Sequence, residues 1–279
     1  MKYEVKVNSS SLCHFTKHFK TLKHILSEGI RFSYAYELFF EASDMGTAIP
    51  MVSFCDIPIS RAAIHMTKYG CYMIGLDKKF IIDYYNAIIN PVIYVHSDNL
   101  QKAINTISNY DKLLIEKECD LVSSASESLI KDESLTDGFI ARFKELSNDR
   151  FNLAFILGLT KPYFDRLTKQ CFYDEREWRA FWPDWSRWHW NITRSKYDLK
   201  KKEWNQTLVD NKDNFITAPS DCLCQAITHI IVKKESQRNE VIDYIKNSKL
   251  IFGNNDVSNE ERILLISKVS SFEQVVQDY

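Results

Sequence analysis

The residues best suited to chemistry lie past the middle of the chain, in residues 172–185, which read Phe-Tyr-Asp-Glu-Arg-Glu-Trp-Arg-Ala-Phe-Trp-Pro-Asp-Trp. If this stretch is a β-strand, its side chains alternate between two faces, so Glu175, Glu177 and Arg179 share one face. On a solvated edge such charges would simply pair. The stretch continues into a dense group of tryptophans: Trp182, Trp185, Trp188 and Trp190. That density favours a functional site, built on two carboxylates and a guanidinium, over a solvated edge.

A second candidate group lies near the start of the chain, in the segment Leu12–Thr16. Its apolar character predicts a short buried strand that contains His14. Apolar residues at helical spacing follow, and Gly29 is placed to end that helix. A single histidine in an apolar strand is more often a hydrogen-bonded core residue than a catalytic one. His14 therefore gains weight only from the groups that lie beside it.

The remaining elements must position these groups. Prolines at both ends punctuate a predicted strand over Pro50–Pro58, and a Tyr69-Gly70 turn precedes a strand over Cys71–Leu76. A helix is expected from about Asp77. The other predicted elements are a strand at 90–96, a loop or flap at 193–213, a strand at 226–233, a helix at 239–247 and a strand at 263–269.

The fold class predicted from this pattern is α+β, with a mixed β core in a single domain over residues 1–279. Residues 98–150 carry eleven acidic and seven basic side chains with helical patterns and no strand signal, so we expect a helical insertion there. A basic, Trp-rich segment occupies residues 178–204. The irregular spacing of the strands argues against a simple βαβ series.

Composition limits the partners. Lys and Arg total 36 against 37 for Asp and Glu, so a nucleic-acid partner would have to meet a local basic patch. Residues 176–202 supply one, with eight basic and three acidic side chains. The N-terminal sequence lacks the apolar core of a signal peptide, and no uncharged apolar run is long enough to cross a bilayer. We therefore expect a cytoplasmic protein with no membrane partner.

Several kinds of site are disfavoured. The seven cysteines are scattered and odd in number, which fits reduced thiols better than disulfides. Cys222 and Cys224 lie near His229, but a second ligand pair is missing, so no metal is expected. The seven glycines form neither a dinucleotide-binding nor a phosphate-cradling motif. Cys55 and His65 are more easily explained as structural residues than as a nucleophile and its base.

The motifs that remain resemble a known family, the AbiGi family of abortive phage resistance proteins. The resemblance spans roughly the first two thirds of the chain. It is carried by His14-Phe-Thr with the helix up to Gly29, Pro50-Met-Val-Ser-Phe-Cys-Asp-Ile-Pro58, His65, Tyr69-Gly70, Ile74-Gly-Leu76, Asn90-Pro-Val-Ile-Tyr94 and Phe172-Tyr-Asp-Glu-Arg-Glu-Trp-Arg179.

The order of these motifs is also similar to the ADP-ribosyltransferase fold, and the opening His-x-Thr strand and helix resemble DarT-like and CmdT-like toxins, which modify nucleic acid. This resemblance implies a first-strand histidine, a middle-strand polar or aromatic residue and a late-strand glutamate. Carried over, these are His14, then Ser53 or Phe54 or Tyr69, and Glu177. The helical insertion departs from a minimal transferase and leaves the middle position open.

The resemblance implies NAD as co-substrate. Glu177 would hold a ribose hydroxyl and stabilise positive charge as the nicotinamide bond breaks, and Glu175 would position the acceptor or tune Glu177. Which of the two glutamates is catalytic stays open. His14, with Phe15 and Thr16 beside it, would contact a ribose.

Further residues implied to contact NAD are aromatic or basic. Phe54 or Tyr69 would stack on the nicotinamide. Arg31 or Arg179 would meet the pyrophosphate, since a guanidinium matches phosphate oxygens in a bidentate way.

The expected function is an ADP-ribosyltransferase toxin that acts on nucleic acid, with single-stranded RNA as the favoured acceptor and a cognate antitoxin protein that restrains it. The Trp and Arg cluster would stack on bases and follow the backbone, or would dock a partner protein. Two alternatives stay open: a catalytically inactive antitoxin or sensing partner, and a transferase that acts on protein.

Overall fold

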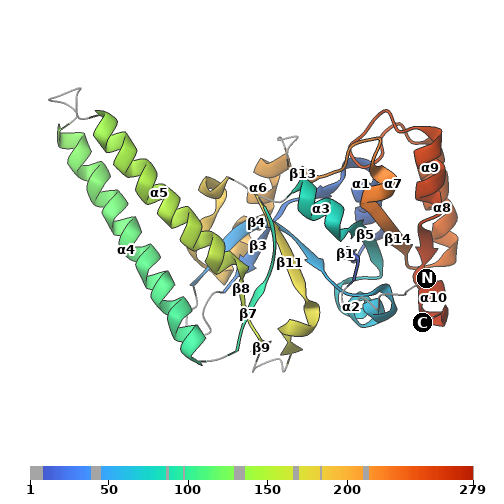
Figure 1. Cartoon of the computed structure of the whole chain (residues 1–279), viewed down its shortest axis with the longest axis horizontal. Helices are drawn as coiled ribbons and strands as arrows, with labels where there is room; N and C mark the ends of the chain where they lie inside the picture. Colours follow the sequence, from blue (N-terminus) through green and yellow to red (C-terminus); the bar gives the residue numbers. More distant parts are fainter. Residues whose placement is uncertain are drawn as a thin grey trace, which may run out of the picture.

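The fold is built on a mixed β-sheet, seen in a computed structural model that describes residues 9–38, 45–85, 88–96, 98–128, 136–165, 170–182, 184–209 and 214–278 (Figure 1). Within these residues nine strands form the sheet. Seven follow the order β15 (Val269–Ser271), β14 (Ile227–Val232), β5 (Tyr72–Asp77), β1 (Ser11–Thr16), β4 (Met45–Cys55), β11 (Glu177–Phe181) and β6 (Ile89–Pro91). The predicted α+β class is therefore confirmed.

The long strand β4 organises the centre of the sheet. Its N-terminal half pairs with β3 (Ser33–Glu37) and β12 (His189–Thr193), and its C-terminal half pairs with β11. At its last residue it meets β1 on one side and β11 on the other, since Cys55 pairs with both Cys13 and Glu177. The first-strand and late-strand motifs, which are more than 150 residues apart in the sequence, thus lie next to each other.

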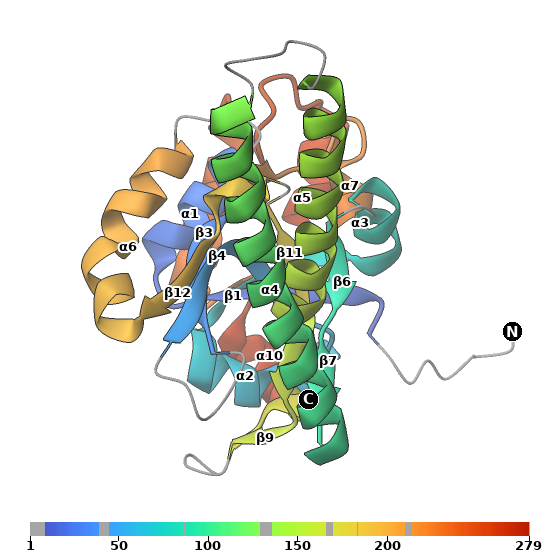
Figure 2. The ribbon, with the colours of Figure 1, turned by 90° about the vertical axis from the view of Figure 1, so that its left-hand side faces the viewer.

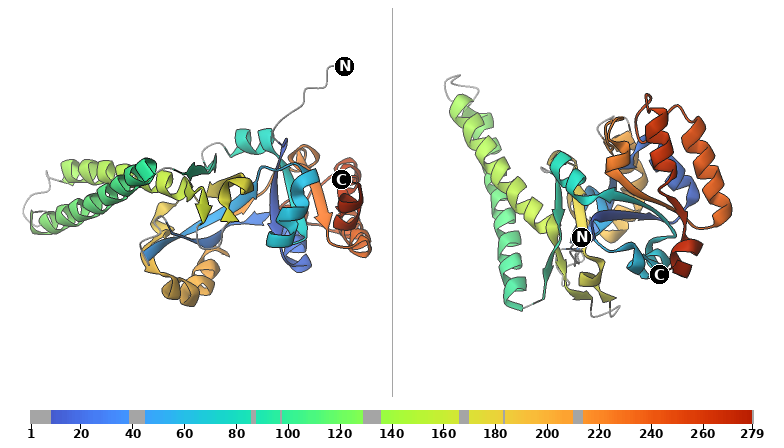
Figure 3. Two further views of the ribbon diagram at one scale, coloured as in Figure 1. Left: turned by 90° about the horizontal axis from the view of Figure 1, so that it is seen from below. Right: turned by 45° about the vertical axis from the view of Figure 1, so that its right-hand side comes forward.

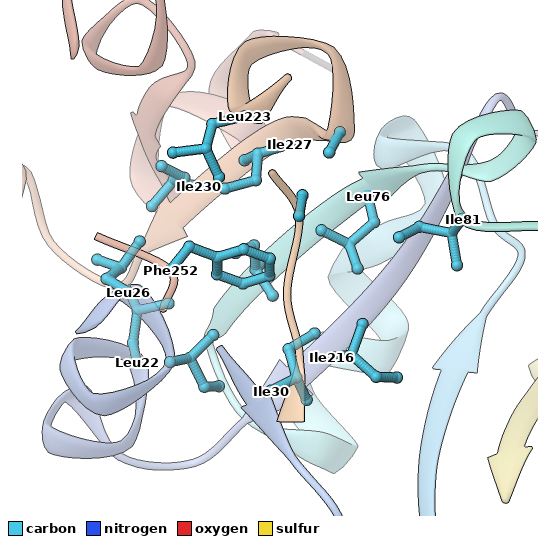
Figure 4. Packing of buried hydrophobic residues seen from close by; sticks show 14 of the residues in the cluster. Leu22, Leu26, Ile30, Leu76, Ile81, Ile216, Leu223, Ile227, Ile230 and Phe252 are labelled. Carbon is cyan, nitrogen blue, oxygen red and sulfur yellow. The ribbon is translucent and has the colours of Figure 1, made fainter. Parts of the chain in front are cut away.

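Helices pack on the half of the sheet that runs from β15 to β1. Helix α1 (Phe19–Glu28) buries Leu22, Ile25 and Leu26 and ends at Gly29, whose φ of 99° favours glycine. Helices α3 (Lys78–Tyr84), α7 (Leu223–Ala226), α8 (Glu235–Asn247) and α9 (Asn259–Ile266) complete this part of the molecule. Figure 4 shows the resulting core, where Leu22 and Leu26 of α1 approach the ring of Phe252.

The predicted insertion is a pair of long helices, α4 (Asp98–Ser128) and α5 (Thr136–Leu159), which extends away from the sheet (Figures 1 and 3). Figure 2 shows the two helices side by side in front of the sheet. Short strands join the pair to the body: β7 (Ile93–Val95) leads into α4, and β8 (Thr160–Pro162) follows α5 directly. Because β7 and β8 pair in parallel, the two connections of this arm lie together.

Two predicted elements are wrong. The sequence predicts a loop or flap over 193–213, but Arg194–Val209 is helix α6. Three of its apolar residues, Tyr197, Trp204 and Leu208, lie at helical spacing and pack beside β3 and β12. Most of the predicted strand at 263–269 is instead the end of α9, which Ser258 caps at its N-terminus, and strand β15 begins only at Val269. Ile263 and Leu264 of α9 are exposed, so their apolar run does not mark a buried strand.

None of the helices in the described part of the chain combines the length and apolar character that crossing a bilayer requires. Among the same residues, no three His, Cys, Asp or Glu side chains gather closely enough to hold a metal ion.

Candidate functional site

The candidate site lies where β1, β4 and β11 meet, and three of the predicted residues come together there. Ser53, on β4, donates a hydrogen bond from its hydroxyl to Glu177 Oε1 at 2.8 Å. His14, on β1, lies with Nδ1 2.9 Å from the main-chain oxygen of the same Ser53. The first-strand histidine, middle-strand serine and late-strand glutamate therefore form one connected group.

Glu177 is an ionised carboxylate in a nearly closed setting, with 7% of its surface exposed. Arg179 Nε lies 2.9 Å from Oε1 and Nη2 lies 3.2 Å from Oε2, while Lys161 Nζ is 2.9 Å from Oε2. Burial alone would raise the pKa of this carboxyl, but Arg179 and Lys161 outweigh it and lower the pKa to about 2. With Ser53 included, both oxygens of Glu177 accept two hydrogen bonds each.

Glu175 also lies beside Lys161, but it is not on the strand where the sequence places it. It lies in a short 3-10 turn, Phe172–Glu175, and not in the strand, because Arg176 adopts a left-handed conformation with φ of 43° before β11 begins. Its Oε2 is 2.8 Å from Lys161 Nζ. Glu175 and Glu177 thus share one ammonium group, although they are not neighbours on a strand face.

Helix α2 (Ala62–Tyr69) supplies the other partners of Glu175. Lys68 Nζ lies 2.7 Å from Oε1, and the phenol of Tyr69 donates a hydrogen bond to the same oxygen. Burial would raise the pKa of Glu175, but its hydrogen bonds and charges, led by Lys161, lower it. Burial and this hydrogen bond raise the pKa of Tyr69, so the phenol stays protonated and remains a donor.

His14 is a neutral imidazole at pH 7. Burial lowers its pKa and outweighs the hydrogen bond to Ser53, which raises it. Since a carbonyl oxygen only accepts, the proton of the neutral ring is on Nδ1, and Nε2 is an acceptor. The ring lies edge-on to Phe54, with centroids 5.9 Å apart, which fixes its orientation.

Two predicted ligand contacts are wrong. Arg179 is fully buried, where it also pairs with Glu37 at 3.0 Å and donates to the carbonyl of Gly158, so it cannot meet a pyrophosphate. Phe54 is 1% exposed and packs in the main core, so its ring cannot stack on a ligand. Of the two aromatic candidates, Tyr69 is the one beside the carboxylates.

The remaining predicted residues are Phe15, Thr16 and Arg31. Phe15 stacks on His65 with ring centroids 6.2 Å apart, and Thr16 ends β1 opposite Tyr72. Arg31 is exposed on the short strand β2 (Ile30–Arg31), opposite Phe215. Contacts of these residues with NAD stay predictions.

Sequence reasoning missed Lys161 and Lys68. Lys161 lies between an apolar run and Pro162, with no pattern that marks it as chemical. It reaches the site only because strand β8 follows the arm back to the sheet. Lys68 precedes the predicted Tyr69-Gly70 turn, and no local pattern indicates its contact with Glu175.

Two tryptophans of the Trp-rich segment lie in the core. Trp182 and Trp188 are 5% and 4% exposed. Trp182 lies edge-on to Phe32, and Trp188 lies edge-on to Phe181. Base stacking by these two tryptophans is therefore wrong. The basic character of the segment is instead displayed on helix α6, whose exposed cations include Arg194, Lys196, Lys201 and Lys202.

The lowered pKa of Glu177 predicts acid sensitivity. In the unfolded chain this carboxyl takes up a proton near its ordinary pKa of 4.5, whereas in the folded chain it does so near 2. Its contribution to stability is therefore complete above pH 4.5 and is lost as the pH falls to 2. Urea midpoints measured across this range should fall with acid. In Glu177→Gln the decline should be shallower, and an equally steep decline in that variant would contradict the assignment.

Comparisons with known proteins agree with the motifs. The family described as abortive phage resistance protein AbiGi, antitoxin, matches residues 43–216, more than half of the chain. The abortive phage resistance protein AbiGi of Lactococcus lactis subsp. cremoris is 25% identical over 242 residues, covering 83% of this chain and 89% of that protein. No solved structure is significantly similar to the chain. The chain belongs to the AbiGi family of abortive phage resistance proteins.

Proposed function

We propose that this chain is an NAD-dependent ADP-ribosyltransferase toxin that modifies nucleic acid, with single-stranded RNA as the favoured acceptor, in abortive defence against phage. The observation that carries the proposal is the hydrogen-bonded connection from His14 through Ser53 to Glu177. These residue types on a first, a middle and a late strand are the set that the resemblance to such transferases implies.

The electrostatics of Glu177 suit the chemistry. Cleavage of the bond between nicotinamide and ribose develops positive charge on the sugar, and an ionised carboxylate fixed beside it stabilises that charge. Ser53 and Arg179 hold the carboxylate in one orientation, so little reorganisation is needed during the reaction. The neutral His14 ring offers Nε2 as an acceptor for a ribose hydroxyl.

Substrate binding requires one change at Glu177. Its oxygens already accept four hydrogen bonds, which is about their full capacity. A ribose hydroxyl must therefore replace one donor. Lys161 is best suited to leave, because it keeps its bond to Glu175, while Arg179 is enclosed.

The preference for nucleic acid is supported by charge. The exposed cations of α6 form a local basic surface on a chain whose acidic and basic residues balance overall. Such a surface attracts the phosphate backbone without reading sequence. The surface lies at the β12 side of β4, away from Ser53, so a bound strand would have to extend along the sheet.

A second candidate function is an antitoxin that binds a toxin protein without catalysis. It is favoured by the description of the family as an antitoxin. The closed ion-pair network around Glu177 would then serve stability alone. This function requires a stable complex with a companion protein and no consumption of NAD.

Incubation of the purified protein with NAD labelled in its adenosine half tests the proposal. Equal samples receive single-stranded RNA, DNA or a cell lysate, and label is measured in each fraction. The proposed function predicts label in the nucleic acid, most strongly in RNA. Label in protein alone would contradict the acceptor, and intact NAD in every sample would favour the antitoxin.

A further inference from the structure

The two glutamates of the site converge on Lys161. Its Nζ lies 2.8 Å from Glu175 Oε2 and 2.9 Å from Glu177 Oε2. Two oxygens that contact one nitrogen at these distances are at most about 6 Å apart, close enough for strong repulsion between like charges in a buried site. The side chain of Lys161 is 17% exposed and those of both glutamates are 9% exposed, so water screens this repulsion only in part.

Carboxylates held this close without a cation between them tend to share a proton, because ionising the second one is unfavourable. Other groups also face the pair. They are Arg179 on β11, Lys68, Tyr69 and His65 on α2, Cys55 on β4 and Tyr94 on β7. Glu37 on β3 lies beside Arg179, and Asp174 in the 3-10 turn lies beside His65.

Lys161 differs from the other cations in its reach. Arg179 divides its hydrogen bonds among Glu177, Glu37 and a carbonyl. Lys68 is 41% exposed and pairs with Glu175. Lys161 forms ion pairs with both glutamates.

The backbone fixes Lys161 in this position. Strand β8 pairs with β7 so that Lys161 lies opposite Tyr94. The main-chain N–H of Glu177 in turn donates to the Tyr94 hydroxyl at 2.7 Å. Lys161 therefore lies on β8, next to strand β7, whose Tyr94 is hydrogen-bonded to Glu177.

We propose that Lys161 is a positioning residue that keeps Glu175 and Glu177 ionised together, so that both act as hydrogen-bond acceptors at neutral pH. Its importance for NAD turnover rests on the proposed function, whereas its effect on the two carboxylates does not. Burial would lower the pKa of Lys161, but the two glutamates outweigh burial and raise it, so the ammonium stays charged.

Carbon NMR of protein labelled at glutamate carboxyl carbons tests this inference without NAD. Signals are assigned with Glu175→Gln and Glu177→Gln. In Lys161→Met, one of the two carboxyls should take up its proton about one pH unit or more above its wild-type value. Lys161→Gln, which keeps a donor without charge, should behave in the same way if the methionine variant does not fold. Lys161→Arg should restore the wild-type titration.

The matched control is Lys23→Met, which removes an exposed lysine paired with Glu240 and should leave both signals unchanged. Titrations in Lys161→Met and Lys161→Gln that match the wild type within a few tenths of a pH unit would overturn the inference. If the wild type consumes NAD, the activity of Lys161→Met should begin to fall at a higher pH than that of the wild type when the solution is acidified. Lack of NAD turnover in the wild type would count against the proposed function alone.

Discussion

Glu177→Gln should reduce nicotinamide release from NAD by about 10²–10⁴-fold while the protein stays folded. The substitution is nearly isosteric, so the amide oxygen can still accept from Ser53, which now donates to Oε1 at 2.8 Å. What is lost is the negative charge that would stabilise the developing positive charge on the sugar. Release of nicotinamide is measured by chromatography with NAD and RNA in excess.

The control for this variant is Glu145→Gln, which changes the same chemical group at an exposed position on α5. It should release nicotinamide at the wild-type rate. Circular dichroism and thermal unfolding show whether each variant is folded. A folded Glu177→Gln protein with wild-type turnover would show that Glu177 takes no part in the chemistry.

Arg179→Met should destabilise the protein by about 3–5 kcal/mol, as expected when one partner of a buried ion pair is removed. Arg179 is fully buried and pairs with both Glu177 and Glu37. Without it, both glutamates lose a partner, and the carbonyl of Gly158 loses its donor. Urea denaturation at neutral pH measures the change in free energy of unfolding.

Arg142→Met is the control, because Arg142 makes an exposed ion pair with Glu145, and its loss should change stability by less than about 1 kcal/mol. Combining Arg179→Met with Glu177→Gln should cost less than the sum of the two single changes, since the double variant no longer leaves a charged Glu177 without Arg179. A loss below about 1 kcal/mol in Arg179→Met would show that water reaches the ion pairs.

Local periodicity was sufficient for much of the fold. The spacing of Leu22, Ile25 and Leu26 before Gly29 predicts α1, and Asp77 does begin the next helix by capping α3. Alternation in a strand also places Glu177 and Arg179 on one face. Glu177 and Arg179 do pair, as charges on one strand face ordinarily do, but they pair inside the protein and not at a solvated edge.

What the sequence could not predict depends on tertiary contacts. The polar composition of 194–209 hides the helical face formed by Tyr197, Trp204 and Leu208, and a tryptophan pattern does not distinguish a core ring from a surface ring. Lys161 is the clearest case, because its role depends on how the arm returns to the sheet. Sequence patterns describe neighbours along one element, whereas Lys161 contacts two glutamates on a turn and a strand beyond it.

The mass of a single-stranded RNA after incubation with NAD and the purified protein tests the central claim most directly. The account predicts RNA that is heavier by whole ADP-ribosyl groups with the wild type, and unmodified RNA with Glu177→Gln. Unmodified RNA together with intact NAD in the presence of folded wild-type protein would contradict it.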